Sequence, residues 1–137
     1  MNIRRLNNDD YYNYLPLINE FRSTQFTKEE FIEYLNILPN NIHIYVVEND
    51  KTIIATGTLI IEPKLIFNIT KLAHIEDVCV LDRYRQNKVG SFIVKHLIKV
   101  AKEEKCYKVT LTCSEKVSHF YLSNGFEVRG LQCSQLV

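Results

Sequence analysis

The stretch His74–Val80, with the sequence HIEDVCV, places two neighbouring carboxylates in an otherwise apolar run. Burying an unpaired carboxylate is costly, so packing alone gives no reason for Glu76 and Asp77 to stand there. Side chains alternate along a regular strand, so the two acids should point to opposite faces unless a bulge intervenes. Such carboxylates could bind an amine or a sugar hydroxyl, or take up a proton. A structural ion pair with Lys71 or Arg83 is the other interpretation that the residues leave open.

A polar loop follows this stretch, with the sequence RQNKVGS at residues 85–91, and it leads into a helical pattern. The N-terminus of a helix presents unpaired N–H groups and the positive end of the helix dipole, which suit a phosphate or pyrophosphate. Arg85 and Lys88 add positive charge, and Gly90 allows a close approach of the backbone to a ligand. On spacing alone, the same residues also describe an ordinary exposed connection between a strand and a helix.

Tyr121, in the segment HFYLSNGF, is the third candidate for chemistry. One of two adjacent aromatic residues in a helix must point away from the other, so Tyr121 could hold its hydroxyl in a cleft. There it could act as a general acid toward a leaving thiolate. We interpret His119 as a surface residue. A metal site is disfavoured because His74 and Glu76 lack a convincing third ligand.

One α/β domain must position these residues, because 137 residues allow a single core and no internal linker or repeat divides the chain. The pattern predicts the order β-α-α-β-β-β-α-β-α-β, a mixed central sheet flanked by helices. Thr27 and Glu30 have the spacing of a capping box, and Pro16 predicts a kink in the first helix. The predicted strands are 2–6, 42–48, 52–62 with a possible bulge at 56–58, 74–80, 107–113 and, last, the tail 126–137; the predicted helices are 9–21, 27–38, 89–105 and 114–125.

Composition narrows the class of protein. A formal net charge of +1, with 46% hydrophobic and 24% charged residues, gives no general attraction to nucleic acid or to membranes. The segment Met1–Asp10 has no apolar core of a signal peptide, and no apolar run approaches the roughly 20 residues that span a bilayer. We therefore expect a cytoplasmic protein. The four cysteines are interpreted as small hydrophobic residues without C-x-x-C spacing: Cys79, Cys106, Cys113 and Cys133.

Several segments together resemble a known family. They are the HIEDV strand, the loop from Arg85 to Gly90, CYKVTL, the FY…GF pattern and, upstream, IRRL and ATGTLIIEPKLI. The chain is similar over nearly its whole length to the acetyl-CoA-dependent GNAT superfamily, and within it to the glucosamine 6-phosphate N-acetyltransferases. The resemblance implies the GNAT fold, acetyl-CoA as co-substrate without a metal, and an amino sugar phosphate as acceptor. It also implies a homodimer whose C-terminal strands pack against, or cross to, the partner.

The resemblance also implies a role for individual residues. Glu76 and Asp77 would hold the amino sugar, whose amine attacks the thioester directly, and Tyr121 would protonate the departing CoA thiolate. Lys64, Tyr107 and Lys108 match positions that line the sugar phosphate site. The expected contacts to acetyl-CoA come from the strand Val78, Cys79 and Val80, from the loop Arg85, Gln86, Asn87, Lys88, Val89, Gly90 and Ser91, and from Tyr121 and Ser123.

Three departures from the family pattern stand out. Lys88 occupies a place where many GNAT loops carry a glycine, and Thr112 stands where the family usually has an acid near the amine. The tail CSQLV lacks the basic residue that the family places near its end, and Arg22 is the substitute that we expect at the sugar phosphate. Two alternatives stay open: an acetyltransferase acting on another small amine or on a peptide, and a non-catalytic acyl-CoA-binding module or inactive dimer partner.

Overall fold

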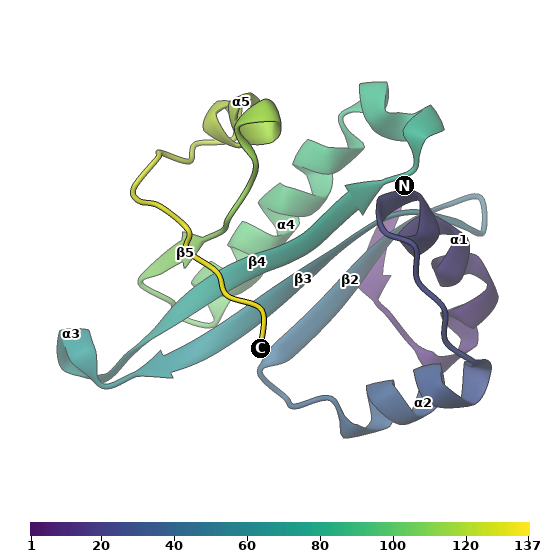
Figure 1. Ribbon diagram of the computed structural model, residues 1–137, viewed down its shortest axis with the longest axis horizontal. Helices are drawn as coiled ribbons and strands as arrows, with labels where there is room; N and C mark the ends of the chain where they lie inside the picture. The colour runs from purple at the N-terminus through teal and green to yellow at the C-terminus, as the bar shows by residue number, and fades with distance from the viewer.

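A computed structural model describes residues 1–137 as a five-stranded mixed sheet flanked by helices (Figure 1). The strands lie in the order β1-β2-β3-β4-β5. Neighbouring strands from β1 to β4 are antiparallel, and β5 runs parallel to β4. This confirms the predicted mixed sheet. The strands are β1 (Asn2–Arg5), β2 (Ile42–Asn49), β3 (Thr52–Lys64), β4 (Thr70–Val80) and β5 (Lys108–Thr110).

Helices cover both faces of the sheet, because neighbouring residues of β3 contact different helices. The Thr56 hydroxyl lies 3.3 Å from the Tyr14 hydroxyl of α1, whereas a Cβ built on Gly57 would point at Ile93 and Leu97 of α4. Side chains alternate along a strand, so α1 and α4 lie on opposite faces. The helices are α1 (Tyr11–Phe21), α2 (Lys28–Ile37), α3 (Ile66–Ile69), α4 (Val89–Glu103) and α5 (Glu115–Ser123), with 3-10 helices η1 (Asn8–Asp10) and η2 (Asp82–Asn87).

Several local signals in the sequence are confirmed. Thr27 caps α2 and forms the full capping box with Glu30. Asp50 and Lys51 join β2 to β3 with positive φ at both positions, the backbone that a two-residue hairpin turn requires. The predicted kink at Pro16 is not found as an interruption, because α1 continues through it to Phe21.

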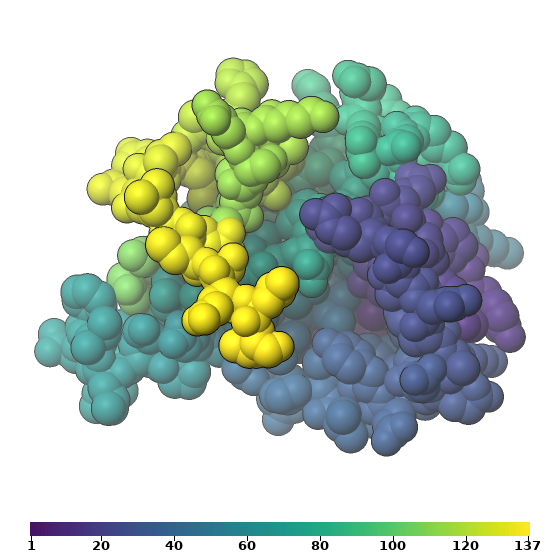
Figure 2. Space-filling view, in the orientation of Figure 1, coloured from purple at the N-terminus to yellow at the C-terminus, as the bar shows by residue number.

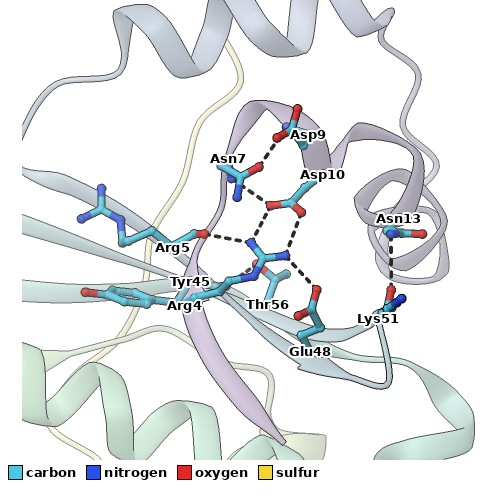
Figure 3. A network of polar contacts seen from close by, with 10 residues as sticks. All are labelled: Arg4, Arg5, Asn7, Asp9, Asp10, Asn13, Tyr45, Glu48, Lys51 and Thr56. Atoms are coloured by element: carbon cyan, nitrogen blue, oxygen red, sulfur yellow. Dashed lines mark hydrogen bonds and ion pairs between the residues drawn. The ribbon is translucent and has the colours of Figure 1, made fainter.

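An ion-pair network ties the N-terminal strand to the sheet (Figure 3). The Arg4 guanidinium donates to both carboxylate oxygens of Asp10, at 2.8 and 2.9 Å, and to Glu48 at 3.0 Å. Burial by itself raises the pKa of the Asp10 carboxyl, but the hydrogen bonds from Arg4 and from the Asn7 N–H outweigh it and hold the pKa below its usual range. The network therefore depends on an ionised Asp10.

The end of the chain differs from the sequence-based prediction. Residues 126–137 form no strand, so the predicted order holds only as far as α5. In Figure 1 this tail leaves α5 and crosses in front of β4, and Leu131, Leu136 and Val137 are almost fully exposed. A strand needs a neighbour to pair with, and no free strand edge of the chain pairs with the tail. The predicted strand 107–113 is also shorter, at Lys108–Thr110.

The tip of the β3–β4 hairpin has no counterpart in the prediction from sequence. It carries the short helix α3 and three consecutive residues with positive φ, Phe67, Asn68 and Ile69. Leu65 and Ile69 are exposed there, at 85% and 79%. No helix of the structure has the length and apolar character needed to cross a membrane.

Candidate active site

The strands β4 and β5 separate partway along the sheet. They pair over three residues only, Leu72 to His74 of β4, whereas the pairing of β4 with β3 continues to Val80. From Ile75 onward, the β4 edge that faces away from β3 has no partner strand. Its free N–H and C=O groups can pair with the amides of an extended ligand and polarise a carbonyl oxygen.

A β-bulge lies where this edge begins. Thr58 pairs with Glu76 and Thr56 pairs with Cys79, so Asp77 and Val78 together lie opposite Gly57. Asp77 has a φ of 50°, the left-handed conformation that Asp and Asn tolerate better than most residues. The sequence predicted a bulge around Gly57, and the structure places the extra residue on β4.

The bulge accounts for the two neighbouring acids. Glu76 and Asp77 are both exposed and neither makes an ion pair with another residue of the chain. Lys71 pairs with Glu104 instead, and Arg83 lies over the ring of Tyr84. The alternative of a structural ion pair with Lys71 or Arg83 is therefore wrong. Both carboxylates are free to meet a ligand.

The residues of β4 after the bulge differ in what they can offer a ligand. Cys79 is buried, and burial raises the pKa of its thiol to about 12, so the thiol is neutral and unreactive at physiological pH. This agrees with its interpretation as a small hydrophobic residue. Val78 and Val80 are partly buried against the core. Of these three residues, only the backbone is left to meet an extended ligand.

The predicted anion-binding loop forms the end of this edge. Residues Asp82–Asn87 make the 3-10 helix η2, and α4 begins at Val89. Arg85 is held by a 2.9 Å ion pair with Asp82 and by a 3.3 Å hydrogen bond to the Val80 carbonyl. Arg85, Gln86, Asn87 and Lys88 are exposed, as a pyrophosphate site at a helix N-terminus requires.

Lys88 separates η2 from α4 in a left-handed conformation, with φ 61° and ψ 16°. This explains why a glycine suits the position. Val89 is fully buried, so only its backbone can meet a ligand.

Gly90 has a packing role in addition to the one predicted. A Cβ at Gly90 would lie 3.1 and 3.2 Å from ring atoms of Phe120, so the side-chain space of this glycine is filled by α5. The structure thus gives Gly90 a packing role that the sequence did not indicate, and the approach of a ligand to its backbone stays a prediction. The contact holds the C-terminal half of α5, which carries Phe120 and Tyr121, against the start of α4.

Tyr121 follows Phe120 and its ring packs edge-on against Phe120 and Phe126, with centroids at 4.9 and 5.8 Å. Burial raises the pKa of its hydroxyl, with a smaller effect of the same sign from Cys113. The hydroxyl is therefore fully protonated at neutral pH and can donate a proton.

Asn124 is a site residue that the sequence analysis missed. Its amide donates to the Ser91 hydroxyl at 3.1 Å and to the Phe120 carbonyl at 2.8 Å, so it links the end of α5 to the first turn of α4. In the sequence it is only the second-last residue of the predicted helix 114–125. The Ser123 hydroxyl donates to the Phe120 carbonyl at 2.7 Å within its own helix.

The residues predicted for the acceptor lie in two groups. Glu62 of β3 accepts a 2.8 Å hydrogen bond from His74 of β4 and lies 3.5 Å from the Lys64 ammonium. The hydrogen bond from His74, with the nearby Lys64, lowers the pKa of Glu62. Lys64 also lines a cavity of about 390 Å³ at the base of the hairpin.

Tyr107 and Lys108 form the second group, where β5 begins. The Lys108 ammonium lies 5.6 Å from the centre of the Tyr107 ring, and that ring lies 5.1 Å from the ring of Phe67 in the hairpin tip. Thr112 is exposed after β5, and Arg22 bends back onto Phe21 at the end of α1. No contact within the chain joins Arg22 to the other predicted residues.

One face of the molecule is hollowed. Figure 2 shows a recess between the yellow C-terminal tail and the purple and blue surface of α1 and α2, with teal atoms of the central strands deeper inside. The free edge of β4 thus runs from the two exposed acids Glu76 and Asp77 to a helix N-terminus suited to phosphate. This arrangement can hold an extended anionic acyl carrier against an amine.

Comparison with known proteins gives the same chemistry. Residues 2–126 match the model of the acetyltransferase (GNAT) family. The chain is 38% identical over 135 residues to a glucosamine 6-phosphate N-acetyltransferase of Candida albicans, covering 94% of this chain and 91% of that protein. It is 36% identical to glucosamine 6-phosphate N-acetyltransferase 1 of Dictyostelium discoideum, covering 98% and 89%.

A solved structure is also closely similar. The crystal structure of glucosamine-6-phosphate N-acetyltransferase from Arabidopsis thaliana superposes with a TM-score of 0.92 at 33% identity, covering 98% of this chain and 97% of that one.

Proposed function

The chain belongs to the acetyltransferase (GNAT) family, and on that premise we propose that it moves the acetyl group of acetyl-CoA to the amine of glucosamine 6-phosphate. The observation that carries the proposal is the free edge of β4, bordered by two unpaired acids and followed by a helix N-terminus. Relatives named for this reaction match the chain over nearly all of its length. The product is the N-acetylated sugar phosphate and CoA.

The residues of the chain divide the work as follows. Acetyl-CoA supplies the activated thioester. The exposed N–H groups around Lys88 and the Arg85 guanidinium meet its pyrophosphate. The unpaired N–H groups of β4 beyond the bulge stabilise negative charge on the carbonyl oxygen as the amine attacks. Tyr121, whose raised pKa keeps it protonated, gives its proton to the departing thiolate. The attacking nitrogen releases one proton to solvent, and Tyr121 takes one back from solvent, so the protons balance over the turnover.

Charged side chains are proposed to recognise the acceptor sugar. Glu76 and Asp77 are free to fix the hydroxyls and the amine of the sugar, and holding the two reactants together supplies much of the rate gain. Lys64, Lys108 and Tyr107 are proposed at the phosphate, where each lysine acts as a point charge. Thr112 is proposed near the amine of the sugar, and Arg22 at its phosphate. Arg22 must turn away from Phe21 to reach a ligand, because its guanidinium lies 4.7 Å from the centre of that ring.

We also propose that the enzyme works as a homodimer in the cytoplasm, where acetyl-CoA and sugar phosphates are made. The support for the dimer is the unpaired tail 126–137, with Leu131 and Leu136 fully exposed, and the exposed hairpin tip. Light scattering of the full chain and of a chain ending at Phe126 tests it. A full chain that is monomeric at micromolar concentration would remove the dimer from the proposal.

An assay of thiol release tests the activity. The enzyme with acetyl-CoA should release CoA rapidly with glucosamine 6-phosphate and much more slowly with glucosamine, because the lysines recognise the phosphate. Equal rates with both sugars would contradict the phosphate site. Faster release with polyamines or a peptide amine would identify another N-acetyltransferase. Binding of CoA with no turnover of any acceptor would identify a non-catalytic module.

A further inference from the structure

One side chain from outside the acetyl-CoA site is tied directly to it. Glu20, in the last turn of α1, accepts a 2.9 Å hydrogen bond on its Oε2 atom from the backbone N–H of Asp82. The two residues are 62 positions apart in the chain. Asp82 is the first residue of η2, the segment that carries the predicted pyrophosphate contacts.

This hydrogen bond gives the backbone N–H of Asp82 a partner that its own helix cannot provide. The first N–H groups of a helix have no partner inside the helix, and Leu81, the residue before η2, offers no side-chain cap. The other polar side-chain contacts of the segment 82–88 are local: the ion pair of Arg85 with Asp82 and its bond to the Val80 carbonyl. Tyr84 in the middle of the segment packs against the core, so Glu20 holds its beginning and Tyr84 its centre. Glu20 is therefore the one side chain from a distant part of the sequence that hydrogen-bonds to this segment.

The anchor itself is held firmly. Leu17 of α1 is 1% exposed, and the buried hydroxyl of Tyr14 lies against Thr56 of β3. Helix α1 is thus fixed to the sheet, and Glu20 extends from its final turn. A charge-assisted hydrogen bond from a fixed helix limits the positions that the start of η2 can take.

Asp82 links Glu20 to Arg85, one of the predicted pyrophosphate ligands. The backbone of Asp82 is held by Glu20, and the carboxylate of Asp82 is 2.9 Å from the Arg85 guanidinium. Fixing Asp82 therefore restricts Arg85, which lies at the predicted pyrophosphate site. Without Glu20, the first residue of η2 loses this restraint, and fixing it when the ligand binds costs affinity.

We propose that Glu20 is a positioning residue for acetyl-CoA, which orders η2 and Arg85 for the pyrophosphate without touching either substrate. The inference rests on the proposed function for the identity of the ligand. It assigns to α1, which lies on the opposite face of the sheet from α4, a part in binding the acyl donor.

The test compares three variants. Glu20→Ala removes the acceptor oxygen, Glu20→Gln keeps an oxygen that accepts the same hydrogen bond, and Glu33→Ala removes an exposed glutamate of α2 that makes no side-chain contact. Glu20→Ala should raise the Kd for CoA, measured by titration calorimetry, and the KM for acetyl-CoA by about fivefold. Its kcat and its KM for glucosamine 6-phosphate should stay within about twofold of the wild type.

Recovery by the conservative variant distinguishes positioning from a general loss of structure. Glu20→Gln should keep most of the wild-type affinity for CoA, and Glu33→Ala all of it. Unchanged CoA binding in Glu20→Ala, or an equal rise of both KM values, would overturn the proposal. Because CoA binding is measured without an acceptor, failure of the sugar assay would leave this test intact.

Discussion

Replacing Lys88 separates the cost of a backbone conformation from the value of a charge. Lys88 has a φ of 61°, where a residue with a Cβ is strained by about 1 to 2 kcal/mol relative to glycine. Lys88→Ala keeps the strain and removes the ammonium, whereas Lys88→Gly removes both. The two variants therefore have the same charge and differ in the backbone strain and in the conformational entropy of glycine.

The expected magnitudes follow from that difference. Glycine also loses more conformational entropy on folding, so we expect Lys88→Gly to be more stable than Lys88→Ala by about 1 kcal/mol. For a chain of this size that corresponds to a Tm roughly 3 °C higher. Both variants lose one contact to a diphosphate, so the KM for acetyl-CoA should rise in both by about fivefold.

Thermal unfolding and steady-state kinetics measure the two effects separately. Lys95→Ala, at an exposed position of α4 without an ion pair, controls for the loss of a lysine. A Tm for Lys88→Gly at or below that of Lys88→Ala would refute the reasoning from strain. A KM for acetyl-CoA that changes in neither variant would remove Lys88 from the pyrophosphate site.

Other substitutions test the remaining parts of the site and fold. Tyr121→Phe should lower kcat by about 100-fold with little change in CoA affinity, and an unchanged kcat would exclude Tyr121 as the proton donor. Lys108→Ala should raise the KM for glucosamine 6-phosphate about fivefold and leave that for acetyl-CoA unchanged; the opposite pattern would move Lys108 to the cofactor. Gly90→Ala should destabilise the fold by about 1 to 3 kcal/mol in denaturant unfolding, because its Cβ would meet Phe120; wild-type stability would mean that the ring moves aside freely. The lowered pKa of Asp10 means that its ionised form adds stability above about pH 4, which is lost as pH falls through the lower folded pKa. Asp10→Asn should therefore cost about 2 kcal/mol at pH 7, with the difference from wild type shrinking toward pH 2; a constant difference would contradict the role of the charge.

Much of the fold was predictable because its signals are local. The capping box at Thr27 and Glu30, the turn at Asp50 and Lys51 and the apolar face of α4 each lie within a few residues. The tail 126–137 shows the limit of such signals. A segment with strand-like composition becomes a strand only when another strand pairs with it, and the single chain provides none.

The candidate site was predictable in residue type more than in geometry. The acids at 76 and 77 and the basic loop were found from their spacing, but the bulge that frees both acids depends on the pairing of β4 with β3. Glu20 bonds to Asp82, 62 positions away in the sequence, and Asn124 bonds to Ser91, 33 positions away. Neither contact has a local signature, because each depends on how the helices pack around the sheet.

The close fit of Phe120 against Gly90 has a consequence for engineering this enzyme. Residues 90 and 120 share one volume, so they form a size-matched pair that must be redesigned together. A larger residue at 90 calls for a smaller one at 120, and Gly90→Ala combined with Phe120→Leu is the natural exchange. Phe120 directly precedes Tyr121, so libraries aimed at new acyl donors should vary positions 90 and 120 jointly.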